Sequence, residues 1–220
     1  METVFRPARA SDADAAVPLI LSSGPAAFSY VFDVPGHGDA RAFLQRAFVH
    51  GGGEFGWRNH VVGELDGRVV AAGAAWSGRA TPAFTRAALG QVISHYGAIA
   101  GTGVAVRGLR VEAIVRPPAR DVWYVAHLGV PAELRGRGIG AALVRHLLEL
   151  GQSQGYTSTE LDVAFTNAAA ERLYERFGYQ VVAERASSLA NDRIAVPGDR
   201  RMAAAIARVA AASSAANHRT

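Results

Sequence analysis

Three glycines at alternate positions, Gly136, Gly138 and Gly140, mark the segment with the clearest chemistry. Glycine leaves backbone N–H groups accessible where a side chain would cover them, and apolar residues at helical spacing follow directly. The first turn of a helix has free N–H groups and the positive end of the helix dipole, which together bind anions. Arg135 and Arg137 add positive charge that suits phosphate. The segment therefore predicts a phosphate site, with a flexible turn carrying two solvated arginines as the alternative.

A dinucleotide fingerprint is a second interpretation of the same residues. Gly136, Gly138 and Ala141 have its spacing, and Asp162 is an acidic residue about 20 positions further on. In a dinucleotide-binding fold, however, the first glycine directly follows the strand, whereas residues 131–135 intervene here. The glycine segment, with the strand before it and the helix after it, also comes late in the chain, and too little sequence follows for a doubly wound sheet. The sequence therefore disfavours a nicotinamide or flavin cofactor.

Composition excludes several other classes of chemistry. The chain has no cysteine and no lysine, and all 23 of its basic residues are arginine. Thiol nucleophiles, disulfides, thiolate metal sites, lysine Schiff bases and the Walker A loop are therefore ruled out. The formal net charge is +4, and the sequence has no run of five basic residues. We accordingly expect no metal site and no nucleic-acid partner.

Length and hydropathy predict one domain in a cytoplasmic protein. The 220 residues are enough to bury a core. Residues 1–6 lack the charged and apolar regions of a signal peptide. Nothing approaches the roughly 18 consecutive apolar residues of a membrane span. We therefore expect no association with a membrane.

A hairpin is the clearest local structure on the N-terminal side. His60–Leu65 and Arg68–Ser77 are rich in residues that favour strands, and Asp66 and Gly67 lie between them. This dipeptide is typical of a two-residue turn with positive φ. The two runs therefore predict an antiparallel pair of strands.

A βαβ unit is predicted around the glycine segment. Its strands are 122–130 and 159–163, and the helix 139–153 between them has Leu143 and Leu147 on one face. Together with the hairpin, this unit predicts an α+β fold. We expect a mixed, mostly antiparallel central sheet flanked by helices on both faces, that is, an α/β/α sandwich.

The domain is expected to span residues 3–203, with an insertion at about 79–120 and an Ala-rich tail over 204–220. Within the insertion, the apolar spacing suggests a helix around Phe84 and His95. Valine-rich runs at 104–106 and 111–115 then suggest a second extended pair. Arg200, Arg201 and Met202 are expected to form a last short strand.

Two blocks of sequence resemble the GCN5-related N-acetyltransferase (GNAT) family. The first joins Leu128, Gly129 and Val130 to the segment Arg135, Gly136, Arg137, Gly138, Ile139, Gly140, and it is similar to the acetyl-CoA motif of that family. Pro131 departs from the pattern, because it comes one position earlier than usual. The second block contains Asp162, Asn167 and residues 173–179. The resemblance is specific over 122–184, rests on element order over 3–77, and lapses across 79–120 and after 203.

The resemblance implies an acetyl-CoA-dependent N-acetyltransferase that acts on the amine of a small molecule or peptide. It places the pyrophosphate of CoA on residues 135–140 and the pantetheine along residues 128–130, with Asn167 as a further contact. The N–H of Leu128 or a neighbour would polarise the thioester carbonyl. Tyr174 matches the general acid that protonates the CoA thiolate, although a core aromatic would have the same spacing. Asn167 is a helix N-cap under either interpretation.

The general base is open among several residues. Asp162 lies near the position of a catalytic glutamate in some family members, but it could equally pair with an arginine. His127 has a suitable imidazole. If its strand alternates, however, His127 points away from the face of Tyr124 and Ala126, which is the working face in the family. Glu112 and Glu64 are outside candidates.

The acceptor amine is expected to bind opposite the cofactor, between residues 24–56 and the insertion. Aromatic residues crowd these stretches, and most are expected to be core: Phe28, Tyr30, Phe32, Trp57, Phe84, His95 and Tyr96. No acidic cluster in the sequence marks a polyamine site. A non-catalytic acyl-CoA-binding sensor is the alternative function. Dimers are common in the family, so the resemblance also allows a homodimer.

Overall fold

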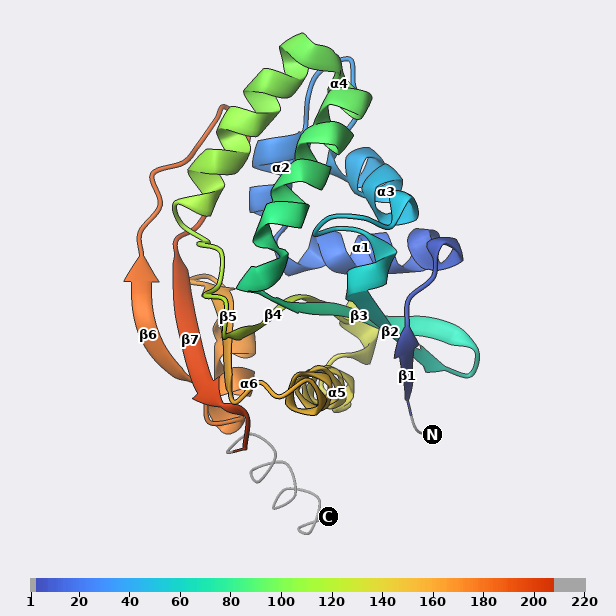
Figure 1. Cartoon of the computed structure of the whole chain (residues 1–220), viewed down its shortest axis with the longest axis vertical. Coiled ribbons are helices and arrows are strands. Elements are labelled where there is room, and N and C mark those ends of the chain that lie inside the picture. The colour runs from blue at the N-terminus through green and yellow to red at the C-terminus, as the bar shows by residue number, and fades with distance from the viewer. Residues whose placement is uncertain (1–2, 208–220) are drawn as a thin grey trace.

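A seven-stranded sheet forms the centre of the protein in a computed structural model, which describes residues 3–207 (Figure 1). The strand order is β1-β2-β3-β4-β5-β7-β6, and only the pairing of β4 with β5 is parallel. The expected mixed, mostly antiparallel sheet is therefore confirmed. The strands are β1 (Val4–Pro7), β2 (His60–Leu65), β3 (Arg68–Ser77), β4 (Trp123–Gly129), β5 (Ser158–Ala164), β6 (Gln180–Arg185) and β7 (Asp199–Ala205).

Helices cover both faces of the sheet, as expected for an α/β/α sandwich (Figure 1). One face packs against α1 (Ala13–Ser23), α2 (Pro25–Phe32), α3 (Ala40–His50) and α4 (Thr81–Glu112). The other face packs against α5 (Ile139–Ser153) and α6 (Ala168–Arg176). Each layer has its own apolar core. Ile20, Phe43 and Phe48 are buried on the first side, and Leu143, Leu147 and Met202 on the second.

The hairpin of β2 and β3 forms as the sequence predicts. Asp66 has φ 51° and Gly67 has φ 75°, which is the pair of positive angles that a two-residue hairpin turn requires. His60 opposes Ala74 at the open end of this pair. The register shifts by one residue between Gly63 and Glu64, so the turn and this irregularity together set the position at which His60 enters the sheet.

The predicted extended pair at 104–106 and 111–115 is wrong. Residues 98–112 are helical and form the second arm of α4, which is broken at Gly97 by non-helical angles (φ 72°, ψ 174°). The two arms approach closely at Gly101, where an added Cβ would lie 3.2 Å from Val92. Val104 is 1% exposed in the same core. Burial against the other arm and α2 therefore outweighs the strand propensity of valine.

Side chains on both arms tie α4 to α2. The hydroxyl of Tyr96 donates to the carbonyl of Phe32 at 2.7 Å, and the guanidinium of Arg107 donates to the carbonyl of Val31 at 2.8 Å. Both contacts satisfy carbonyls at the C-terminal end of α2, where helical partners are lacking. The insertion is thus a helical hairpin that packs against α2 (Figure 1).

The C-terminal strand is longer than predicted. Residues 200–202 lie within β7, which runs between β5 and β6 and continues to Ala205. Met202 is fully buried, and Ile206 is 2% exposed. Ala204 and Ala205, which the sequence analysis assigned to the tail, therefore belong to the sheet. The rest of the predicted tail, from residue 208 on, lies outside the described residues.

Among residues 3–207, no helix taken singly has the length and apolarity to cross a membrane. The segments Ala10–Ser23 and Pro25–Phe32 would suffice together in length and composition, but they are bent by 104° relative to each other. Both contribute buried side chains to the core, among them Val17 and Ile20.

Candidate functional site

Strands β4 and β5 separate soon after they meet. Their recorded pairs are Trp123 with Thr159 and Tyr124 with Glu160. Beyond Tyr124, β4 is paired with β3 alone, while β5 continues beside β7 as far as Ala164. Within residues 3–207, the edge of β4 that leads to the predicted cofactor residues Leu128, Gly129 and Val130 therefore has no strand partner on the β5 side.

The glycine segment connects this open edge to α5. Gly136 has φ 75° and Gly138 has φ 82°, and a Cβ at either position would meet no atom within 4 Å. The requirement for glycine is therefore conformational, because L side chains rarely adopt such angles. Gly138 is the N-cap of the 15-residue helix α5 and provides no capping side chain. The first N–H groups of α5 are consequently free for an anion.

Positive charge lies beside these free N–H groups. Residues 135–138 are all exposed, and the Nε of Arg135 donates to the carbonyl of Val130 at 3.1 Å. This bond ties the segment to the end of β4. Ile139 is buried, and a Cβ added at Gly140 would lie at ordinary van der Waals distances from Val130 and Leu173. The residues of the predicted phosphate site are therefore brought together in one exposed turn.

Helix α6 carries the two predicted residues of the second block. Asn167 is its N-cap, and its side-chain oxygen accepts from the N–H of Ala170 at 3.2 Å. Tyr174 is 8% exposed and packs edge-on against Tyr179, with 6.0 Å between the ring centroids. Among the described residues, its hydroxyl has no hydrogen-bond partner. Burial raises the pKa of Tyr174 to about 12, so the phenol stays protonated and able to donate.

A β-bulge in β4 changes the direction of His127. Ala72 opposes Gly129 and Ala74 opposes Ala126, so β4 has one residue more than β3 in this interval. His127 lies within it and has φ 57°. The expectation that His127 follows regular alternation is therefore wrong, because a bulge re-aims the side chain.

His127 lies on the same face of the sheet as Tyr124. Its ring is 5.5 Å from Trp76, which also packs against Tyr124. Phe28 and Phe55 lie 5.9 Å and 5.4 Å away. The bulge thus places an imidazole among aromatic rings on the side covered by the α1–α4 helices.

Two residues that the sequence analysis did not single out contact His127. His60 Nε2 lies 3.2 Å from His127 Nδ1, and Glu54 Oε1 lies 3.4 Å from His127 Nε2. His60 is 2% exposed, whereas the side chain of Glu54 is 42% exposed. His60 precedes His127 by 67 residues, and no spacing in the sequence indicates the contact.

Asp162 is engaged by an arginine, which was one of the two alternatives for it. Its carboxylate lies 2.5 Å from Arg201 Nη2 and accepts a hydrogen bond from the hydroxyl of Tyr124 at 2.8 Å. The Asp162 side chain is 4% exposed, and that of Arg201 is 8% exposed. Arg201 also pairs with Glu160 at 3.2 Å. Both oxygens of Asp162 therefore already accept hydrogen bonds.

The outside candidates for a base lie in different places. Glu64 forms an ion pair with Arg6 at 2.6 Å between β1 and β2. Glu112 ends α4, and its pKa is raised by burial and by the negative charge of Glu54. Glu54 and Glu112 are thus acidic groups on the same side of the molecule, a proximity that the sequence did not reveal.

The predicted acceptor aromatics separate into three groups. Phe28 and Phe84 contact His127 and Trp76, respectively. Phe32 lies one ring further out, because it packs against Phe28 and Phe55. The other predicted aromatics make neither of these contacts: Tyr30, Trp57, His95 and Tyr96.

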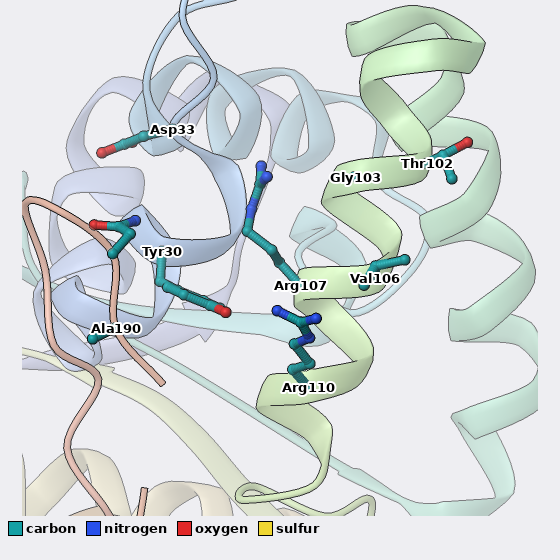
Figure 2. A pocket seen from close by; sticks show the side chains of 9 residues that line it. Tyr30, Asp33, Thr102, Gly103, Val106, Arg107, Arg110 and Ala190 are labelled. Carbon is teal, nitrogen blue, oxygen red and sulfur yellow. The ribbon is translucent and has the colours of Figure 1, made fainter. Parts of the chain in front are cut away.

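A pocket of about 480 Å³ lies between α2, the second arm of α4 and the loop before β7. Figure 2 shows Tyr30, Arg107 and Arg110 around it. Arg107 is already bound to the carbonyl of Val31. None of the predicted catalytic or cofactor residues lines this pocket.

A protein-family model and several curated proteins match parts of the chain. The model of the acetyltransferase (GNAT) family matches residues 35–179. A mouse protein, probable N-acetyltransferase family 8 member 5, is 36% identical over 84 residues, which are 38% of this chain and 35% of that protein. Rat N-acetyltransferase 8B is 38% identical over 64 residues, 29% of each chain. The match spans about a third of the length of these curated relatives.

Solved structures share the whole fold. An acetyltransferase structure superposes with a TM-score of 0.63 at 19% identity, covering 92% of this chain and 99% of the other. An N-acetyltransferase from Staphylococcus aureus Mu50 has the same TM-score at 15% identity, with coverages of 91% and 100%. The ribosomal-protein-S18-alanine N-acetyltransferase from Escherichia coli has a TM-score of 0.54 at 17% identity, with coverages of 93% and 94%. At these identities the likeness concerns the fold.

Proposed function

Because the chain belongs to the GNAT family of acetyltransferases, we propose that it moves an acetyl group from acetyl-CoA directly to the amine of a small molecule or peptide. One observation carries the proposal. The unpaired edge of β4 is followed by the exposed glycine turn at the N-terminus of α5, and a hydrogen bond from Arg135 to the carbonyl of Val130 ties that turn to the end of the strand. An extended thiol arm and a pyrophosphate need such adjacent sites, one along a strand edge and one at a helix N-terminus.

The residues of the glycine turn fit the phosphates of CoA. The turn offers free N–H groups, two exposed arginines and the positive end of a 15-residue helix. Since the chain has no lysine, phosphate binding rests on these groups. Residues 128–130 and Asn167 would hold the pantetheine.

The composition favours direct transfer. The chain has no cysteine, so the acetyl group cannot pass through a thioester on the enzyme, and we propose that donor and acceptor are bound together. The acceptor ammonium first gives a proton to a base, and its nitrogen then forms a bond to the thioester carbonyl carbon. The C–S bond breaks as the tetrahedral intermediate collapses. The thiolate takes a proton from Tyr174, whose oxygen is reprotonated by the second proton of the amine nitrogen.

We assign the base to His127 rather than Asp162. Both oxygens of Asp162 accept hydrogen bonds from Arg201, so a substrate ammonium would have to displace an ion pair. His127 has Nε2 turned towards a half-exposed carboxylate, on the face of the sheet that bears Tyr124 and Trp76. The side chain of His127 is 8% exposed and that of Asp162 4%, so the two differ mainly in that Asp162 already binds an arginine.

Calorimetric titration and thiol release on a panel of amines test the proposal. We expect acetyl-CoA to bind with a sub-millimolar dissociation constant and at least one amine to release CoA thiol. Failure to bind acetyl-CoA would contradict both the enzyme and the alternative acyl-CoA sensor. Binding without thiol release on any amine would favour the sensor.

A further inference from the structure

We propose that His60, His127 and Glu54 form a directed hydrogen-bond chain that holds the proton of His127 on Nδ1 and presents Nε2, beside Glu54, to the acceptor ammonium. The catalytic use of this chain rests on the proposed acetyl transfer. The position of the proton is a property of the free protein and can be measured separately.

The chain begins at a backbone carbonyl. His60 Nδ1 lies 2.9 Å from the oxygen of Gly56. A carbonyl only accepts, so Nδ1 of His60 must carry the hydrogen. Burial, reinforced by His127, lowers the pKa of His60 to about 3, so the ring is neutral near pH 7. The Nε2 atom of His60 is therefore left with a lone pair.

The hydrogen bond between His60 and His127 determines which nitrogen of His127 carries the proton. The lone pair of His60 Nε2 faces His127 Nδ1 at 3.2 Å, and the two rings are inclined by only 11°. The 3.2 Å between the two nitrogens is a hydrogen-bond distance, so one of the two atoms must carry a hydrogen and the other must offer a lone pair. Two facing lone pairs would repel, so His127 Nδ1 carries the proton. The neutral ring then has its lone pair on Nε2.

The third contact explains why Glu54 is present. The lone pair of His127 Nε2 faces Glu54 Oε1 at 3.4 Å, and neither atom has a hydrogen to share. An ammonium group can satisfy both, because it donates one hydrogen to Nε2 and another to the carboxylate. Once its proton has moved to Nε2, the imidazolium faces Glu54 as an ion pair. Glu54 therefore stabilises the positive charge both before proton transfer, on the ammonium group, and after it, on the imidazolium of His127.

The loop that carries Glu54 is held on both sides. The side-chain amide of Asn59 donates to the carbonyl of Gly53, and Gln91 of α4 donates to the carbonyl of Gly52 at 2.8 Å. A Cβ on Gly56 would lie 2.3 Å from the backbone of Gly51, so the chain passes too closely for any side chain. The carbonyl that orients His60 and the carboxylate of Glu54 thus belong to one anchored loop.

The surroundings favour a cationic acceptor. Phe28, Phe55 and Trp76 surround the imidazole, and Glu112 adds a second negative charge near Glu54. Aromatic faces and carboxylates together attract an ammonium group. Tyr124, whose pKa is raised well above its usual value by burial and by Asp162, stays neutral on the same face.

Long-range proton–nitrogen NMR correlations of the ligand-free protein test the proton positions directly. His127→Asn and His60→Leu identify the two rings among the seven histidines. Asparagine tolerates the positive φ of position 127. We expect the Nδ1–H form for both neutral rings. An Nε2–H form of His127 would overturn the proposal, whatever reaction the protein catalyses.

Kinetics of His60 variants test the use of the chain. His60→Leu removes the acceptor for His127 Nδ1 and should lower kcat about 10- to 100-fold while leaving acetyl-CoA affinity unchanged. His60→Gln keeps an oxygen that can accept and should restore part of kcat. His146→Leu, on α5 where His146 stacks on Phe5, is the control and should keep kcat. Retained acetyl-CoA binding shows that each variant is folded.

The outcomes separate the two proposals. A wild-type kcat in His60→Leu, or no recovery of kcat in His60→Gln, would contradict the catalytic use of the hydrogen-bond chain even if acetyl transfer is established. Nδ1–H forms of both rings without thiol release on any amine would support the hydrogen-bond chain and contradict the proposed function.

Discussion

Arg201 on β7 contacts Asp162 on β5 through both Nε and Nη2, at 3.2 Å and 2.5 Å. Tyr124 donates to the same carboxylate, and the guanidinium also donates to the carbonyl of Arg116, which precedes β4. Tyr124 and Glu160 are the last recorded pair of the β4–β5 ladder. Asp162 therefore links β4, β5 and β7 at the point where β4 and β5 diverge.

Asp162→Asn should consequently destabilise the fold more than it slows the reaction. The pair is almost fully buried, and removing the charge of Asp162 leaves Arg201 with Glu160 as its carboxylate partner at 3.2 Å, at a cost of about 3 kcal/mol in the free energy of unfolding. Glu184→Gln is the control, since Glu184 pairs with Arg200 at an exposed site and should cost under about 1 kcal/mol. Urea denaturation measures both. Unchanged stability with a large loss of kcat would instead identify Asp162 as the base.

Tyr174→Phe should lower kcat about 100-fold and leave the dissociation constant of acetyl-CoA unchanged. Because the pKa of Tyr174 is raised to about 12, its phenol remains protonated through neutral pH and should not limit the rate there. Tyr156→Phe is the matched control, because its hydroxyl bonds to Ser77 at 2.8 Å and has no proposed role. Stopped-flow thiol release separates the acetyl-transfer step from binding. An unchanged rate in Tyr174→Phe would remove it as the acid.

Gly138→Ala should weaken acetyl-CoA binding about tenfold, because a Cβ strains the positive φ and shifts the free N–H groups of α5. Gly155→Ala provides a control with the same strain, since Gly155 has φ 84° and open space at the far end of α5. Both variants should lose about 1 kcal/mol of stability. Titration calorimetry should show weaker binding for Gly138→Ala alone. Equal affinities would contradict the phosphate site.

The local features of this fold could be predicted from sequence because short-range rules determine them. Asp66 and Gly67 require a particular turn, and the apolar spacing of α5 ends where Gly138 and Gly155 adopt positive φ. The second arm of α4 could not be predicted, since Val104 becomes helical through contacts with a distant partner.

The histidine chain depends on long-range geometry in the same way. The bulge at His127 exists only when β3 and β4 are paired, and the sequence of β4 alone indicates regular alternation. His60 then becomes its neighbour because β2 and β4 both pair with β3. The glycine turn, by contrast, is one continuous segment, which is why all of its residues could be named in advance.

Asp199 should make stability depend on pH. Its pKa is raised to about 6 by burial and then by the charge of Asp162, above the value of about 3.9 expected in the unfolded chain. The unfolded state therefore binds fewer protons between about pH 4 and 6, and Asp199 lowers stability as the pH rises through that window.

Asp199→Asn should be more stable than the wild type by about 1–2 kcal/mol at pH 7, after allowance for solvent screening, and equal to it at pH 4. Asp192→Asn, at an exposed position, should show no such difference. Thermal unfolding measures this difference. The prediction would be contradicted if the stabilities of Asp199→Asn and wild type, plotted against pH, stayed parallel across this range.

Glu54→Gln should raise the KM of the acceptor amine about tenfold and lower kcat as well. Without the carboxylate, the ammonium loses one of its two acceptors, and the imidazolium formed on His127 loses the charge that faces it at 3.4 Å. The imidazolium is then less stable, which is why kcat should fall. Glu149→Gln, on the exposed side of α5, is the matched control and should leave both constants unchanged. A Glu54→Gln enzyme with wild-type KM and wild-type kcat would show that the carboxylate contacts neither the acceptor nor the protonated base.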